Sequence, residues 1–162
     1  MERTLGAYLI STDPTRLDLD AIFAYLSGES YWARGRPRDQ IVRGIENSLP
    51  FGVYRDGDQV GFARIVTDYA TFAWLADVYV LESERGNGVG KALIETIVEH
   101  PAIRGLPRLM LATADAHGLY EQYGFTPLRG DERFMAIEAK ALTESYERDA
   151  GGEAGYGPDH ES

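Results

Sequence analysis

The sequence predicts an α/β fold of the mixed α+β kind, with a central, mostly antiparallel sheet, one parallel βαβ unit and flanking helices. Three observations support this prediction. Residues 19–26 and 41–49 repeat apolar side chains at helical spacing. Residues 51–81 read as three consecutive strands around a hairpin signal. Residues 76–112 run strand, loop, helix and strand, a connection that makes its two strands parallel.

The first third of the chain is expected to hold one strand and two helices. Residues 5–12 suit a strand that Asp13-Pro14 closes. The apolar stripe of residues 19–26 predicts a helix, and Gly28 marks its end. The second stripe, residues 41–49, predicts another helix, which the following proline ends because proline cannot continue a helix.

The middle of the chain is rich in strand patterns. Residues 51–54 and 59–66 flank Asp56-Gly57, a strong hairpin signal. Residues 72–81 form the next apolar run. Three antiparallel strands in succession are therefore expected here.

After the third strand the apolar spacing changes from strand-like to helical. Residues 89–98 keep helical spacing up to Pro101, and residues 108–112 read as a short buried strand. Because a helix separates this strand from the one at residues 76–81, the two are expected to pair in parallel.

The segment after residue 112 predicts a short helix and two closing strands. Asp115 is a plausible N-cap of a helix through Tyr123, and Gly124 suits the left-handed residue after its end. Residues 125–128 and 134–137 then read as strands.

The length of 162 residues fits one domain, which we expect to span residues 1–143. Residues 144–162 hold six acidic residues, one arginine and four glycines but few apolar side chains, and we expect a disordered acidic tail there. The net charge of −10 opposes binding to nucleic acid.

Cysteine is absent and the three histidines are scattered, so no metal site is expected. No apolar run reaches the ~18 residues that span a bilayer. The first residues do not resemble a signal peptide. We therefore expect a cytoplasmic protein that has no membrane partner.

A glycine-rich loop, Arg85-Gly86-Asn87-Gly88-Val89-Gly90, separates the third strand of the middle region from the helix after it. Glycines let the backbone approach a ligand closely, and the N–H groups and dipole of a helix N-terminus favour an anion, above all a phosphate or pyrophosphate. Lys91 follows in the first turn and adds a positive charge.

Three phosphate-binding patterns can be compared with this loop. A P-loop needs a glycine where Arg85 stands and a hydroxyl where Ala92 stands. A dinucleotide fingerprint needs its last glycine one residue after Gly90. The pattern Arg/Gln-x-x-Gly-x-Gly/Ala does fit, with Arg85, Gly88 and Gly90.

That pattern resembles the pyrophosphate-binding motif of the Gcn5-related N-acetyltransferase (GNAT) superfamily. Leu119-Tyr120-x-x-x-Gly124-Phe125 resembles the superfamily's later Leu-Tyr-x-x-x-Gly-Phe segment, and residues 5–140 follow its element order. The resemblance implies the GNAT fold and acetyl-CoA as co-substrate. The alternative is a plain glycine-rich turn followed by a capped helix. The cofactor-binding residues that the resemblance implies are Val78, Val80, Arg85, Gly86, Asn87, Gly88, Val89, Gly90 and Lys91.

The resemblance also implies a direct mechanism, in which an amine attacks the thioester without a covalent enzyme intermediate. Backbone groups of Val78 and Val80 are expected to pair with the pantetheine arm, and the Val80 N–H to polarise the thioester carbonyl. Tyr120 matches the tyrosine that protonates the departing thiolate. The alternative is that Tyr120 is a core aromatic, with Tyr123 as its neighbour.

The general base is left open by the sequence. Asp77 sits in an apolar strand, where an unpaired carboxylate is costly, so it is either the base or a structural residue bonded to backbone or to an arginine. His117 and Glu46 are weaker candidates. Many members of the superfamily carry an asparagine after the later strand, where this chain reads Ala112-Thr113-Ala114-Asp115-Ala116-His117, and Thr113 or Asp115 is expected to make the corresponding hydrogen bonds to the pantetheine or the acceptor.

The acceptor side is expected at the loop between the first two helices, by the same resemblance. Tyr31, Trp32 and Arg34 there would suit a ligand with a flat part and an anionic group. The alternative is a solvated basic loop that Trp32 anchors.

The favoured function is an acetyl-CoA-dependent N-acetyltransferase acting on a primary amine of a small molecule. A peptide or protein N-acetyltransferase and a noncatalytic acyl-CoA-binding sensor are the alternatives. A homodimer is a further open possibility, because small members of this fold often dimerise.

Overall fold

A computed structural model describes residues 1–129 and 131–135 of the chain. These residues divide into two compact units. The first comprises residues 1–18 and 45–131, and it contains the whole sheet. The second comprises residues 19–44 and, within the described chain, residues 132–135.

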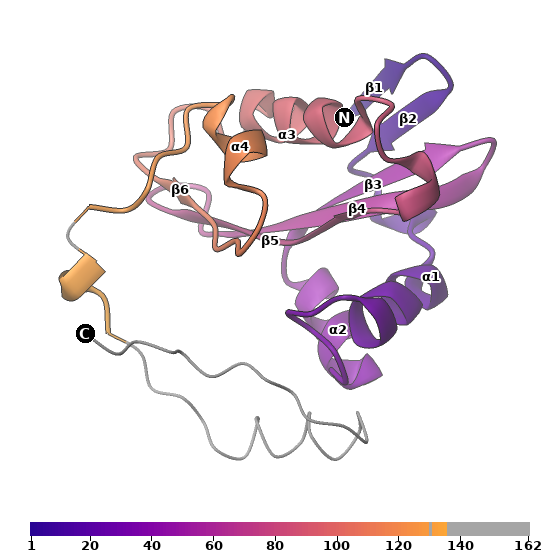
Figure 1. Cartoon of the computed structure of the whole chain (residues 1–162), viewed down its shortest axis with the longest axis horizontal. Coiled ribbons are helices and arrows are strands. Elements are labelled where there is room, and N and C mark those ends of the chain that lie inside the picture. Colours follow the sequence, from indigo (N-terminus) through magenta and orange to yellow (C-terminus); the bar gives the residue numbers. More distant parts are fainter. Residues whose placement is uncertain (130, 136–162) are drawn as a thin grey trace. The chain divides into compact units, whose positions relative to one another are not determined.

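The first unit is built on a six-stranded mixed sheet whose strands are neighbours in chain order (Figure 1). Every neighbouring pair is antiparallel except the last, which is parallel. This arrangement confirms the predicted mixed sheet with one βαβ unit. The strands are β1 (Glu2–Leu5), β2 (Tyr8–Ser11), β3 (Leu49–Arg55), β4 (Asp58–Thr67), β5 (Ala73–Val80) and β6 (Leu109–Met110).

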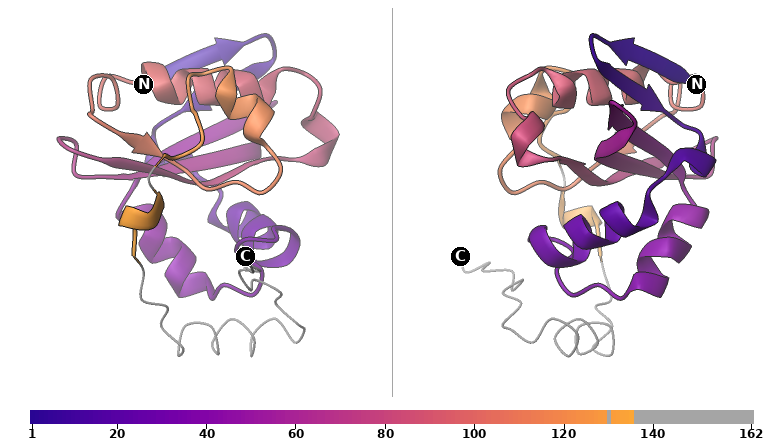
Figure 2. Two further views of the ribbon diagram at one scale, coloured as in Figure 1. Left: turned by 60° about the vertical axis from the view of Figure 1, so that its left-hand side comes forward. Right: turned by 90° about the vertical axis from the view of Figure 1, so that its right-hand side faces the viewer.

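Two α-helices of this unit, α3 (Val89–Glu99) and α4 (His117–Glu121), lie on the same face of the sheet. Figure 2 shows the same relation from two further sides. The apolar stripe of α3, which includes Leu93, Ile94 and Ile97, is fully buried in the main core cluster. An apolar stripe must be covered, so α3 packs onto the sheet. This packing fixes the position of the first turn of α3, and therefore also the position of the glycine loop that precedes it.

Short 3₁₀ turns complete the first unit. They are η1 (Pro14–Arg16) and η3 (Glu82–Glu84), and a further turn, η4 (Asp131–Arg133), lies where the two units meet in the sequence. The η3 turn connects the end of β5 to the glycine loop.

The second unit holds α1 (Leu19–Phe23), the π-helical η2 (Ala24–Glu29) and most of α2 (Arg38–Glu46). The predicted first helix is thus observed, with a wider turn over its second half, and it ends at Glu29, one residue after Gly28. Within this unit, Arg38 pairs with Asp20 at 2.6 Å.

Two predictions in the first half are wrong in detail. Residues 5–12 are not one strand, because Gly6, with a φ of 53°, turns the chain into the β1–β2 hairpin. The second helix ends at Glu46, and Leu49 and Pro50 open β3 instead of closing the helix. A proline is tolerated near the start of a strand, where it removes little pairing.

The segment after β6 also differs from its prediction. Residues 125–128 contain no strand, and Pro127 cannot donate a backbone hydrogen bond there. The N-cap position of α4 is held by Ala116, which makes no side-chain cap bond, so Asp115 is not the N-cap. The Ala116 N–H donates to Oγ1 of Thr113 at 3.1 Å. Gly124 has the predicted left-handed φ, at 87°.

The predicted strand at residues 134–137 is absent at 134 and 135. Residues 136 and 137, the boundary at residue 143 and the tail 144–162 lie outside the described residues.

Candidate active site

The glycine loop lies between η3 and the first turn of α3. Gly86 and Gly88 have φ values of 81° and 77°, a left-handed backbone that side chains make costly. A Cβ at either glycine would meet nothing within 4 Å, so the space around them is open. The first bond along α3 runs from the Ala92 N–H to the Gly88 carbonyl. The N–H groups that precede Ala92 are thus not used within the helix.

The two longer side chains of the loop bond back to the protein. The Arg85 Nε donates to the carbonyl oxygen of Val80 at 3.1 Å. The Asn87 amide donates to the Tyr8 hydroxyl and to the Glu84 carbonyl, both at 3.2 Å. Asn87 therefore contacts the protein through its side chain and can offer a ligand its backbone N–H.

Among the described residues, the outer edge of β5 is unpaired beyond its first two residues. Within the described chain, β6 pairs only with Ala73 and Trp74. At the far end, the N–H of Leu81, the residue after β5, donates to the carbonyl oxygen of Val60 in β4. Because N–H directions alternate along a strand, the N–H groups of Val78 and Val80 point away from β4, toward the outer edge of β5.

Asp77 occupies a β-bulge. Asp77 and Val78 together oppose the single residue Ala63 of β4, and Asp77 has a φ of 53°. Ala63 belongs to the core cluster under α3, so the neighbouring Arg64 points to the opposite face. There its Nε donates to the Asp77 Oδ2 at 2.6 Å. An arginine partner is one of the two roles that the sequence leaves open for Asp77.

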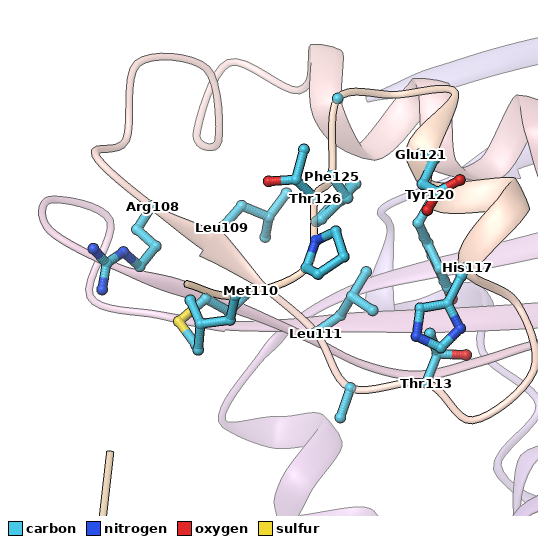
Figure 3. A pocket seen from close by; sticks show the side chains of 14 residues that line it. Arg108, Leu109, Met110, Leu111, Thr113, His117, Tyr120, Glu121, Phe125 and Thr126 are labelled. Carbon is cyan, nitrogen blue, oxygen red and sulfur yellow. The ribbon is translucent and has the colours of Figure 1, made fainter. Parts of the chain in front are cut away.

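Tyr120 lines a pocket of about 430 Å³ in the first unit (Figure 3). The labelled side chains come from β6 and its continuation, from α4 and from the chain after α4. Tyr120 extends from α4 toward the sheet, is 8% exposed and has its ring 5.7 Å from the ring of Phe125. Thr113 and His117 line the same pocket, whereas the glycine loop and Asp77 do not.

The residues expected to bind the acceptor all belong to the second unit. The rings of Tyr31 and Trp32 meet edge to face at 5.0 Å, and Tyr31 is 49% exposed. Arg34 is exposed as well. Tyr31 and Arg34 thus present surface to solvent at this loop, whereas Trp32 is partly buried.

Three residues that the sequence does not single out contact the glycine loop or its flank. Tyr8 of β2 and Arg55 of β3 both donate hydrogen bonds to the Glu84 carboxylate. They lie 76 and 29 residues from Glu84. Only the closeness of Glu84 to the loop is a signal in the sequence, because the other two contacts depend on strand register.

The described residues contain no group of three or more histidine or acidic side chains placed to hold a metal ion. In that same part of the chain, every helix is too short or too polar to cross a membrane.

Comparison with known proteins gives consistent matches. The sequence model of the acetyltransferase (GNAT) family matches residues 19–125. A Gibberella zeae protein named as an acetyltransferase is 36% identical, over 72% of this chain and 77% of that protein. A crystal structure from Xanthomonas campestris pv. campestris, described as a GNAT-family acetyltransferase, is 45% identical with a TM-score of 0.80, over 84% of this chain and 96% of that one.

A more distant solved structure carries a specific activity in its name. The ribosomal-protein-S18-alanine N-acetyltransferase of Escherichia coli is 25% identical with a TM-score of 0.60, over 75% of this chain and 79% of that chain.

Proposed function

Because the chain belongs to the acetyltransferase (GNAT) family, we propose that it transfers an acetyl group from acetyl-CoA directly to a primary amine of a small molecule. Membership makes the protein an acyltransferase and implies an acyl-CoA co-substrate. The choice of acetyl-CoA and of a small amine is the proposal.

The observation that supports acetyl-CoA best is the shape of the glycine loop. Gly86 and Gly88 hold left-handed backbones with open space around them, directly before α3. The unused N–H groups of the first helical turn and the dipole of α3 favour a pyrophosphate there. Lys91 adds a full positive charge in the same turn.

The open edge of β5 suits the pantetheine arm. An extended chain beside this edge would find the N–H groups of Val78 and Val80 on the side away from β4, as a further strand would. We assign the Val80 N–H to polarise the thioester carbonyl, because a fixed donor at the developing negative charge lowers the barrier.

The thioester supplies an activated acyl group, and the protein must then manage protons. We assign Tyr120 to donate a proton to the departing sulfur, since its side chain extends from α4 toward the sheet at the edge of the pocket. Of the two roles open to Asp77, the contact with Arg64 supports a positioning one, because a carboxylate bonded to a guanidinium is a weaker base.

A second acceptor class has one observation in its favour. The E. coli protein named for ribosomal protein S18 alanine resembles this chain at 25% identity. Such a name fits the α-amino group of a protein N-terminus as acceptor. The exposed Tyr31 and Arg34 could contact either a peptide or a small anionic amine.

A thiol-release assay tests the proposal and separates the two acceptor classes. Purified protein is mixed with acetyl-CoA and a panel of small amines, amino acids, polyamines and short peptides with free N-termini. We expect release of CoA with at least one small amine. Turnover with peptides alone would show that the acceptor is a peptide or protein and not a small amine. Tight CoA binding without turnover of any acceptor would favour a noncatalytic sensor.

A further inference from the structure

Four side chains form a connected group beneath the glycine loop, and we call them the anchoring network: Tyr8, Arg55, Glu84 and Asn87. The Tyr8 hydroxyl donates to Oε2 of Glu84 at 2.6 Å, and Nη1 of Arg55 donates to the same oxygen at 2.9 Å. Asn87 donates to the Tyr8 hydroxyl from the other side. Each of the four side chains thus makes at least one hydrogen bond to another member of the network.

The network is rigidly supported by the sheet. Tyr8 lies in β2 and is 8% exposed, and the Arg55 guanidinium stacks 5.7 Å from the centre of its ring. The Glu84 side chain is 13% exposed. Two strands thus hold the turn that enters the loop, although the first four loop residues, 85–88, are exposed.

The charge of Glu84 makes this arrangement informative. A carboxylate one residue before an anion-binding loop would repel a pyrophosphate unless it were neutralised. The Tyr8 hydrogen bond, and then that of Arg55, lower the pKa of Glu84, so the carboxylate is ionised at neutral pH. The positive charge of Arg55 offsets the negative charge of Glu84. Glu84 therefore acts on the loop through its hydrogen bonds and not through its charge.

We propose that Glu84 is a positioning residue which, through Tyr8, Arg55 and Asn87, holds the glycine loop in the shape that binds the pyrophosphate of CoA. The inference rests on the proposed role of the loop. We assign Glu84 no contact with the ligand, because a carboxylate would repel the pyrophosphate and Oε2 of Glu84 already accepts from both Tyr8 and Arg55. Its effect is on the conformation of the residues that follow it.

Isothermal titration calorimetry with CoA tests the proposal on the full chain. We expect Glu84→Ala to weaken Kd about tenfold or more, the size of one lost charge-assisted hydrogen bond. Tyr8→Phe, which removes the hydroxyl alone, should weaken Kd about threefold. Glu84→Gln keeps an acceptor for Tyr8 and should restore part of the loss. The matched control is Glu82→Ala, an exposed acid of the same turn, which should leave Kd unchanged.

Hydrogen–deuterium exchange adds a readout that general destabilisation would not produce. In Glu84→Ala, amides of residues 85–90 should exchange faster while those of β4 and α3 beyond its first turn keep their protection. Unchanged Kd and exchange in Glu84→Ala would overturn the proposal. Equal loss of protection across the sheet would also overturn it, since the residue would then serve stability only. If Glu84→Ala fails to fold, Tyr8→Phe and Glu84→Gln decide alone.

Gly88→Glu distinguishes this inference from the function on which it rests. If Gly88→Glu abolishes CoA binding and Glu84→Ala does not change it, the loop binds CoA and the network is irrelevant. If Gly88→Glu binds CoA normally, the proposed role of the loop itself is wrong.

Discussion

The Nε of Arg64 lies 2.6 Å from the Oδ2 of Asp77, across two neighbouring strands at a β-bulge. Both side chains are largely buried, at 16% and 5% exposure. At the bulge, Asp77 has a left-handed backbone, and Asp77 and Val78 together face a single residue of β4. The ion pair therefore fixes the strand immediately before the N–H groups proposed to meet the pantetheine arm.

Breaking this ion pair should cost both stability and activity. Removal of one partner takes the opposite charge away from a largely buried group, so Arg64→Ala and Asp77→Asn should each lower the free energy of unfolding by about 3 kcal/mol. The double variant should lose less than the sum of the two, because both remove the same interaction. Urea unfolding of the three variants measures the coupling.

Steady-state kinetics then separates the two roles of Asp77. A positioning role predicts that Arg64→Ala and Asp77→Asn lower kcat by similar factors and leave the shape of the pH profile intact. Loss of activity in Asp77→Asn alone would assign Asp77 as the general base.

The close approach of β4 to its neighbours at Gly61 makes a second prediction. A Cβ there would lie 2.9 Å from the Tyr79 carbonyl oxygen and 3.2 Å from the Cβ of Val53. Gly61→Ala should therefore lower the free energy of unfolding by about 1–3 kcal/mol, the usual cost of overpacking. Gly118→Ala is the control, since its Cβ meets nothing within 4 Å and alanine favours the helix. Equal stability of the two variants would contradict the packing at β4.

Tyr54 is a buried phenol, and within the described chain its hydroxyl has no hydrogen-bond partner. Tyr54→Phe should therefore be neutral or stabilising by up to about 1 kcal/mol at neutral pH. Thermal unfolding measures this change. A clear loss of stability would show that the hydroxyl is bonded in solution.

The same residue predicts an alkaline effect. Burial raises the pKa of Tyr54 to about 12, from about 10 in an unfolded chain. Below pH ~10 the phenol is protonated in both states and the stability does not depend on its titration. Between pH ~10 and about 12 the unfolded phenol ionises while the buried one stays protonated, so the free energy of unfolding falls as the pH rises. The wild type should thus lose more stability than Tyr54→Phe across this window. An absorbance titration of the tyrosines should also show that the variant lacks one phenol that ionises near pH 12 in the wild type.

Tyr120→Phe tests the proposed proton donor. If the phenol protonates the departing sulfur, the variant should lose about a hundredfold in kcat, while the Kd of CoA stays close to that of the wild type. Tyr123→Phe, three residues further along the chain, is the matched control and should keep its activity. Equal turnover of Tyr120→Phe and wild type across the pH range would remove Tyr120 from the mechanism.

The order of strands and helices could be predicted because each element carries its own apolar period. The hairpin at Asp56-Gly57 and the stripe of α3 are local signals that tertiary contacts reinforce. The β1–β2 hairpin is not predictable from the local sequence, because Gly6-Ala7 is a weak turn signal inside an apolar run. Residues 125–128 have a strand-like pattern but form no strand, because a strand also needs a neighbour to pair with. No local pattern shows whether such a neighbour is present.

The candidate site divides in the same way. The glycine loop and Tyr120 belong to motifs with fixed spacing, so the sequence predicts them by number. The partner of Asp77 and the contacts of Glu84 with Tyr8 and Arg55 arise from strand register between distant segments. No periodicity within one segment encodes such pairs.

The central claim is that the loop at residues 85–90 binds the pyrophosphate of CoA. Calorimetric titration of acetyl-CoA into wild type and Gly88→Glu tests it most directly. The account predicts that the wild type binds and that Gly88→Glu does not, because the variant places bulk and a negative charge in a left-handed backbone where the anion would lie. A Gly88→Glu variant that folds and binds acetyl-CoA with wild-type affinity would contradict it.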